Sequence, residues 1–134
     1  MSITKRVFGR NAQGETVTQY ILTNAMGAAI KVIDFGAILT SVTVPDRNGK
    51  LADVVTGFDD MEGYLKPHGS MGETIGRYGN RIAKGRFTID GETYQLAINN
   101  GENHLHGGTG GFHRVFYRVE ELADGVRMSA VSPD

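Results

Sequence analysis

The sequence predicts an all-β protein built as an antiparallel β-sandwich. Turn signals recur about every ten residues, and the runs between them are rich in β-branched and aromatic residues. No segment shows a sustained 3.6-residue hydrophobic period, which an amphipathic helix would need. Short strands at regular spacing are typical of a sandwich or a barrel rather than of a helical fold.

The first half of the chain contains four expected strands, over residues 16–22, 29–34, 37–44 and 51–58. The third and fourth are separated by the turn Pro45-Asp46-Arg47-Asn48-Gly49, where proline presets φ and Asn-Gly supplies a positive φ. Residues 59–65 are the one expected helical turn, with Asp59 as a candidate N-cap and Gly63 as an early interruption.

The second half contains two expected hairpins. One pairs residues 85–89 with 93–98 around Asp90-Gly91, and the other pairs 111–120 with 126–131 around Asp124-Gly125. The chain stops just after the last of these strands. An unfinished sheet would expose unpaired backbone groups. We therefore expect either a longer domain or a partner chain, including a second copy, that completes the sheet.

Composition excludes several classes of protein. The length of 134 residues fits one domain, and we expect residues 1–134 to form part of a single domain. The chain has 14 basic and 15 acidic residues, so it lacks the basic excess of a nucleic-acid-binding protein. The absence of cysteine excludes disulfides and thiol nucleophiles. With no signal-like or membrane-spanning run, we expect a cytoplasmic protein with no membrane partner.

Two glycine-rich segments carry the candidate chemistry, residues 76–85 and 99–112. Glycines allow a ligand or another part of the backbone to approach closely. Asn and Arg provide hydrogen-bond donors suited to polyhydroxylated ligands, and His transfers protons near neutral pH. The Asp90-Gly91 hairpin lies between the segments, so we expect it to bring them together.

Other interpretations of these segments remain open. An Asn-Arg pair beside glycines is also typical of a structural turn with an exposed charge. His104 and His106, two positions apart on a strand, would point the same way and could begin a metal site. No third ligand stands at a suitable spacing, so we expect no metal.

The order of motifs resembles the N-terminal portion of the galactose mutarotase (aldose 1-epimerase) family. The resemblance rests on Gly-Arg-Tyr-Gly-Asn-Arg-Ile-Ala at 76–83, Asn-His-Leu-His-Gly-Gly at 103–108, and the opening segments 35–37, 44–49, 53–55 and 57–59. It implies the family's β-supersandwich and interconversion of the α and β anomers of free hexoses such as glucose and galactose. The implied reaction is acid–base opening of the sugar ring, with no cofactor.

The resemblance also implies roles for particular residues. Asn80 and Arg81 match the family's sugar-binding pair, and His106 matches its first active-site histidine, a catalytic and substrate-binding position. His104 matches no such role. The family's carboxylate base and main acid histidine lie downstream of these motifs, so we expect residues 1–134 alone to catalyse poorly. The alternatives are a non-catalytic carbohydrate-binding module and a half-domain that needs a partner chain.

The sequence departs from the family pattern before Gly72. The family commonly has Pro-Tyr-Phe there, where this chain has Gly69-Ser70-Met71. Packing and sugar contacts at this point are therefore not carried over.

Overall fold

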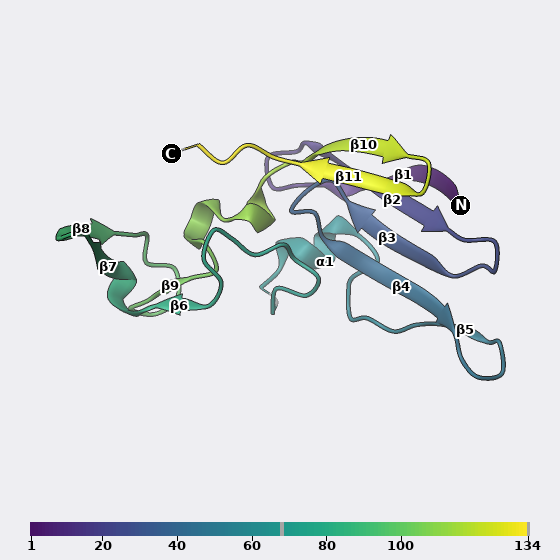
Figure 1. Ribbon diagram of the computed structural model, residues 1–134, viewed down its shortest axis with the longest axis horizontal. Helices are drawn as coiled ribbons and strands as arrows, with labels where there is room; N and C mark the ends of the chain where they lie inside the picture. The colour runs from purple at the N-terminus through teal and green to yellow at the C-terminus, as the bar shows by residue number, and fades with distance from the viewer. Residues whose placement is uncertain (68, 134) are drawn as a thin grey trace. The chain divides into compact units, whose positions relative to one another are not determined.

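The regular secondary structure of the described residues is mostly antiparallel strands with very little helix, as predicted (Figure 1). The computed structural model describes residues 1–67 and 69–133. The chain divides into two compact units. The first, Met1–Glu73 with Phe116–Asp134, is called the sheet unit below. The second, Thr74–Val115, is called the glycine-rich unit. None of the helices in the described residues is long and apolar enough to cross a bilayer.

The sheet unit is built on a five-stranded antiparallel sheet whose strands follow one another in chain order. These strands are β1 (Ser2–Arg10), β2 (Thr16–Thr23), β3 (Ala29–Ile33), β4 (Leu39–Pro45) and β5 (Leu51–Asp53). The connection after β4 is tied by Asp46, whose carboxylate accepts hydrogen bonds from the backbone N–H groups of Asn48 and Lys50 at 2.8 and 2.9 Å. The predicted turn therefore forms.

In the five-stranded sheet, β1 and β5 differ from the prediction for physical reasons. β1 was not predicted, because most of its side chains are exposed and only Phe8 is buried, so no alternating pattern marks it. β5 ends at Asp53 rather than at residue 58. The Asp53 carboxylate accepts hydrogen bonds from the backbone of Val42 and Val55 at 3.1 and 3.2 Å. One backbone bond to β4 follows, from the Val54 N–H to the Val42 carbonyl at 2.9 Å, and the strand goes no further.

The core of the sheet unit lies where the short helix α1 (Met61–Leu65) meets the sheet. Its members are almost fully buried: Phe8, Val17, Ile33, Phe35, Ile38, Met61 and Tyr64. Full burial of each such side chain contributes roughly 1.5–3 kcal/mol. The Tyr64 ring packs edge-on against Phe58 at a centroid distance of 4.9 Å. Apolar burial at this cluster therefore stabilises the unit.

The N-cap of α1 is Asp60, not Asp59 as the sequence suggested. The Asp60 Oδ1 accepts a hydrogen bond from the Gly63 N–H at 3.1 Å. Gly63 lies inside the helix, where a Cβ would overlap the Phe58 side chain. The glycine that the sequence marked as an interruption is thus required for packing.

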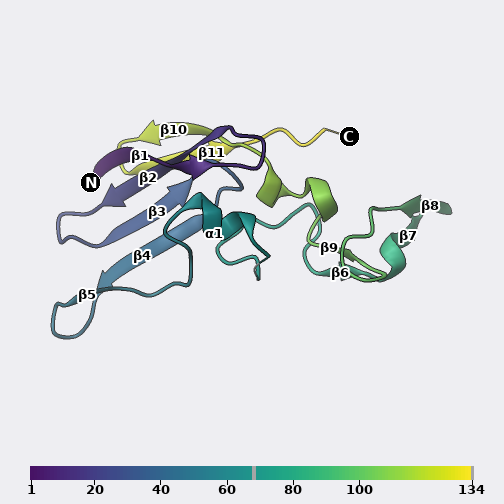
Figure 2. The ribbon, with the colours of Figure 1, turned by 180° about the vertical axis from the view of Figure 1, so that it is seen from behind.

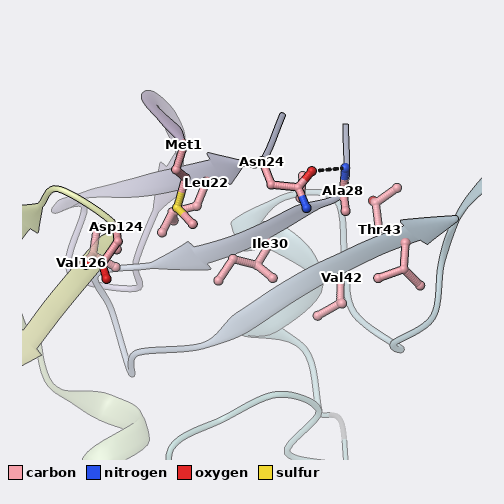
Figure 3. A pocket seen from close by; sticks show the side chains of 12 residues that line it. Met1, Leu22, Asn24, Ala28, Ile30, Val42, Thr43, Asp124 and Val126 are labelled. Atoms are coloured by element: carbon pink, nitrogen blue, oxygen red, sulfur yellow. Dashed lines mark hydrogen bonds between the residues drawn. The ribbon is translucent and has the colours of Figure 1, made fainter. Parts of the chain in front are cut away.

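The hairpin β10 (Arg118–Leu122) and β11 (Gly125–Ser129) belongs to the same unit. Lys5 on β1 pairs with Glu121 on β10 at 2.5 Å, and the Tyr117 N–H donates to the Asp34 carbonyl at 2.8 Å. An apolar pocket of about 340 Å³ is lined by sheet residues such as Ile30 and Val42 and by the tip of this hairpin (Figure 3).

Of the strand predicted over residues 111–120, only residues 118–120 belong to the observed strand β10. Residues 112–114 form a 3-10 helix, η3 (Phe112–Arg114), and the strand begins at Arg118. A Cβ on Gly111 would overlap the His106 carbonyl oxygen and the His113 ring. Residues 111–114 therefore pack closely against these groups and are not extended.

The glycine-rich unit contains short elements only (Figure 2). β6 (Arg81–Ile82) pairs with β9 (His104–Leu105), and β7 (Arg86–Ile89) pairs with β8 (Glu92–Gln95). Two further 3-10 turns are η1 (Ala83–Gly85) and η2 (Gly108–Gly110). Asp90 and Gly91 join β7 to β8 with φ of 52° and 82°, the two positive values of a tight hairpin turn. This hairpin was predicted.

Candidate functional site

The two glycine-rich segments come together in the ladder between β6 and β9. Arg81 is opposite Leu105, and Ile82 is opposite His104. The ladder continues one step further, because the His106 N–H donates to the Asn80 carbonyl at 3.1 Å. All three predicted site residues, Asn80, Arg81 and His106, therefore lie at neighbouring positions on one end of this ladder.

The ladder ends abruptly at Asn80 and His106. Both residues have left-handed backbone conformations, with φ of 63° and 54°. Asn tolerates this region better than most residues, since its short polar side chain can bond locally. Gly107 follows with φ of 83°, and a Cβ at that position would overlap the Gly76 carbonyl oxygen. The backbones of the two segments can approach this closely because residue 107 has no side chain.

His106 is held by its ring as well as by its backbone. The Asn80 N–H donates to His106 Nδ1 at 3.0 Å. A ring nitrogen that accepts a hydrogen bond carries no hydrogen, so the neutral imidazole must carry its hydrogen on Nε2. The half-buried His106 ring thus presents Nε2–H as a donor.

Arg81 is oriented by a residue that the sequence analysis did not select. Its Nε–H donates to Asn100 Oδ1 at 2.8 Å, while the side chain as a whole stays exposed. A guanidinium has five N–H donors, and this bond uses the one on Nε. The four N–H groups on the two Nη atoms are not needed for this contact.

Asn99 is a second residue that was missed. Its side-chain amide bonds both backbone groups of Leu105, accepting from the N–H at 2.7 Å and donating to the carbonyl at 2.9 Å. Asn99 thereby acts as a substitute strand partner for β9. The sequence does contain an Asn-Asn pair, Asn99-Asn100, shortly before His104. Such a pair is equally typical of an ordinary turn, so it did not predict these bonds.

His104, to which no role was assigned, is buried and bonded to the backbone. It is 6% exposed, and its Nδ1–H donates to the Ala97 carbonyl at 2.8 Å. Gly108 packs against the same ring. Within residues 1–67 and 69–133, no group of three His, Asp or Glu side chains is placed to hold a metal ion.

The arrangement determines what the site can recognise. His106 Nδ1 and Asn100 Oδ1 are acceptors that already hold hydrogen bonds. Of the remaining groups on Asn80, Arg81 and His106, His106 Nε2–H and the Arg81 Nη–H groups are donors, and the exposed Asn80 side-chain amide offers both a donor and an acceptor. Such a site suits ligand oxygens that offer lone pairs, as the ring and hydroxyl oxygens of a sugar do.

Comparison with known proteins places the fold in the galactose mutarotase-like class of β-sandwich. A galactose 1-epimerase from Lactobacillus acidophilus NCFM superposes with a TM-score of 0.80 at 26% identity, covering 100% of this chain and 40% of that one. A GalM/aldose epimerase homologue from C. elegans superposes with a TM-score of 0.74 at 37% identity, covering 82% and 34%.

Sequence comparison names the family. The model of the aldose 1-epimerase family matches residues 18–134, so the chain belongs to that family. Galactose mutarotase from Bos taurus is 44% identical over 134 residues, covering 100% of this chain and 39% of that protein. Aldose 1-epimerase from Escherichia coli K12 is 35% identical over 121 residues, covering 90% and 35%. The chain thus spans 39% of the length of the mutarotase it matches.

Proposed function

We propose that this chain supplies the sugar-binding part of an aldose 1-epimerase that interconverts the α and β anomers of free hexoses such as glucose and galactose. The observation that carries the proposal is the donor set at the end of the β6–β9 ladder, which lies within the region matched by the aldose 1-epimerase family. Membership of the family gives the class of reaction, and the local geometry supports binding of sugar oxygens.

The proposed roles follow from the free donors. Arg81 would donate from its Nη groups to sugar hydroxyl or ring oxygens, and the exposed Asn80 side-chain amide would bind the same sugar as the other member of the pair. His106 would touch the substrate through Nε2–H and stabilise the negative charge that develops on an oxygen during ring opening. Oriented donors act strongly where charge develops in the transition state.

The full reaction needs an acid and a base on the same sugar. A base removes the proton of the anomeric hydroxyl while an acid protonates the ring oxygen. The resemblance implies that the main acid and the base belong to the family's downstream region, to which these 134 residues do not align. We therefore expect residues 1–134 by themselves to catalyse slowly, since each positioned group contributes about 10²–10⁴-fold in rate.

Polarimetry tests the proposal directly. The rotation of fresh α-glucose and α-galactose should relax faster with a chain extended through the region aligned to the rest of the relatives than with residues 1–134. Arg81→Ala in the extended chain should raise KM, whereas Arg47→Ala, at an exposed turn arginine, should leave it unchanged. Equal rates for the two chain lengths, well above background, would contradict the division of roles.

A sugar-binding protein without turnover is the outcome that would replace the enzyme proposal. It would show saturable binding of glucose or galactose, lost in Arg81→Ala, with no acceleration of mutarotation in any form of the chain. A cytoplasmic location and completion of the sheet by a partner or a second copy also stay predictions. Cell fractionation and the oligomeric state in solution are the measurements that check them.

A further inference from the structure

A site that depends on Arg81 requires its guanidinium to be held in one orientation. Its side chain is exposed, long and flexible, and a free guanidinium would sample many rotamers. The described contact that restrains the head group is the bond from Nε–H to Asn100 Oδ1, at 2.8 Å. A 2.8 Å bond that uses the charged donor is among the stronger kinds of hydrogen bond.

Asn100 is well placed to act as a fixed acceptor. Its backbone is closed into a tight turn, since its N–H donates to the Asn103 carbonyl at 3.1 Å and the Asn103 N–H donates back at 2.9 Å. Gly101, with φ of 58°, allows this turn. The Asn100 side chain is half-buried, so its amide loses less freedom on bonding than an exposed one would.

We propose that Asn100 is a positioning residue: it holds the Arg81 guanidinium by Nε, so that the Nη donors are preorganised for a sugar oxygen. This inference rests on the proposed function of the site. Preorganisation lowers the entropy lost when a ligand binds. Asn100 does not need to touch the sugar, and its effect passes through Arg81.

The first experiment separates substrate binding from turnover in the full chain. Asn100→Ala should raise KM for the hexose about 3–10-fold with little change in kcat, the pattern of an interaction made equally in the ground and transition states. Asn100→Asp keeps an oxygen acceptor beside the guanidinium and should restore KM to within about twofold. Asn48→Ala, at an exposed turn, is the matched control and should leave both constants unchanged.

A double-mutant cycle asks whether the effect runs through Arg81. In an Arg81→Ala background, Asn100→Ala should have no further effect on KM, because the group that it positions is gone. Additive effects of the two substitutions would overturn the inference. So would an Asn100→Ala variant with unchanged KM, or one that Asn100→Asp fails to rescue.

A direct readout keeps this test separate from the proposed function. Hydrogen exchange of Arg81 Nε–H, followed by NMR, should speed up several-fold in Asn100→Ala and stay slow in Asn48→Ala. If the full chain shows no mutarotation, the proposed function fails, and galactose affinity from equilibrium titration replaces KM in the same comparison. Unchanged Nε–H exchange in Asn100→Ala would overturn the positioning role whatever the activity.

Discussion

The two units of this chain are stabilised by different kinds of interaction. The hydrophobic core belongs to the sheet unit, where Val17, Ile33 and Ile38 are at most 1% exposed. In the glycine-rich unit, the buried positions are glycines and histidines: Gly76, Gly85, His104, Gly108, Gly111 and His113. One unit is held by apolar burial, and the other is held by close backbone approach and by side chains that bond the backbone.

The difference fits the function proposed for the glycine-rich unit. A ligand site needs exposed polar groups, which contribute no apolar burial. The glycine-rich unit keeps Asn80 and Arg81 exposed, and it compensates with directional contacts such as those made by Asn99 and His104. The sheet unit has no such constraint at its core and follows the ordinary rule of burying large apolar side chains.

The largest expected effect is in the sheet unit. Ile33→Ala should lower the free energy of unfolding by about 2–5 kcal/mol, because it leaves a cavity at a fully buried position. Ile89→Ala makes the same chemical change at a residue that is 54% exposed, on β7 of the glycine-rich unit, and should cost much less. Urea unfolding measures both. Similar losses in the two variants would break the comparison between the units.

The next effect tests close backbone approach in the glycine-rich unit. Gly107→Ala should cost roughly 2–4 kcal/mol, because it adds left-handed strain to an overlap with the Gly76 carbonyl. Gly91→Ala is a matched control, since Gly91 has φ of 82° against 83° at Gly107 but has open space around a Cβ. The control isolates the backbone strain. If the hydrogen-exchange rate of the His106 amide rises equally in Gly107→Ala and Gly91→Ala, then the overlap with the Gly76 carbonyl contributes nothing to the loss of stability.

A smaller effect is expected for the polar clamp on β9. Asn99→Ala removes two hydrogen bonds to Leu105 and should destabilise the ladder by about 1–3 kcal/mol. Exchange of the Leu105 amide should accelerate, while amides of β2 and β3 in the sheet unit stay protected. Asn48→Ala makes the same chemical change at an exposed turn of the sheet unit and provides the control. Protection of Leu105 unchanged from the original chain would show that side-chain bonds do not hold this unit.

The smallest effect concerns pH and the sheet unit. Burial raises the pKa of Asp34 above its ordinary value of 3.8, although a hydrogen bond from the Thr18 N–H at 2.9 Å opposes the shift. The folded state then binds the proton more tightly than the unfolded state. This contribution to stability is complete below the ordinary pKa, and it is lost as pH rises through the raised value.

Asp34→Asn removes that titration while keeping an oxygen that can accept from Thr18. The unfolding free energy of the original chain minus that of Asp34→Asn should therefore fall as pH rises from below the ordinary pKa of 3.8 through the raised pKa of Asp34. Denaturant unfolding at several pH values measures the difference. A difference that stayed flat or rose with pH would contradict the burial of this carboxyl group.

Local patterns predicted the regular parts of the fold. β2 and β3 were foreseen from their β-branched residues, and the β7–β8 hairpin from Asp90-Gly91. β1 escaped notice, because an edge strand with a single buried side chain leaves no alternation to detect. The end of β5 was misplaced, because Asp53 bonds the backbone and closes a turn, an effect that depends on where β4 lies.

The candidate site shows the same difference between features that local sequence predicts and features that depend on contacts between distant residues. The sequence by itself determined the family and which segments carry Asn80, Arg81 and His106, because motif order and spacing are local facts about the chain. Only the tertiary structure decided which of their polar groups are bonded within the chain. The bonds from Asn80 to His106 and from Arg81 to Asn100 join residues 26 and 19 positions apart. Contacts at such separation depend on how the backbone is folded, and no local pattern specifies them.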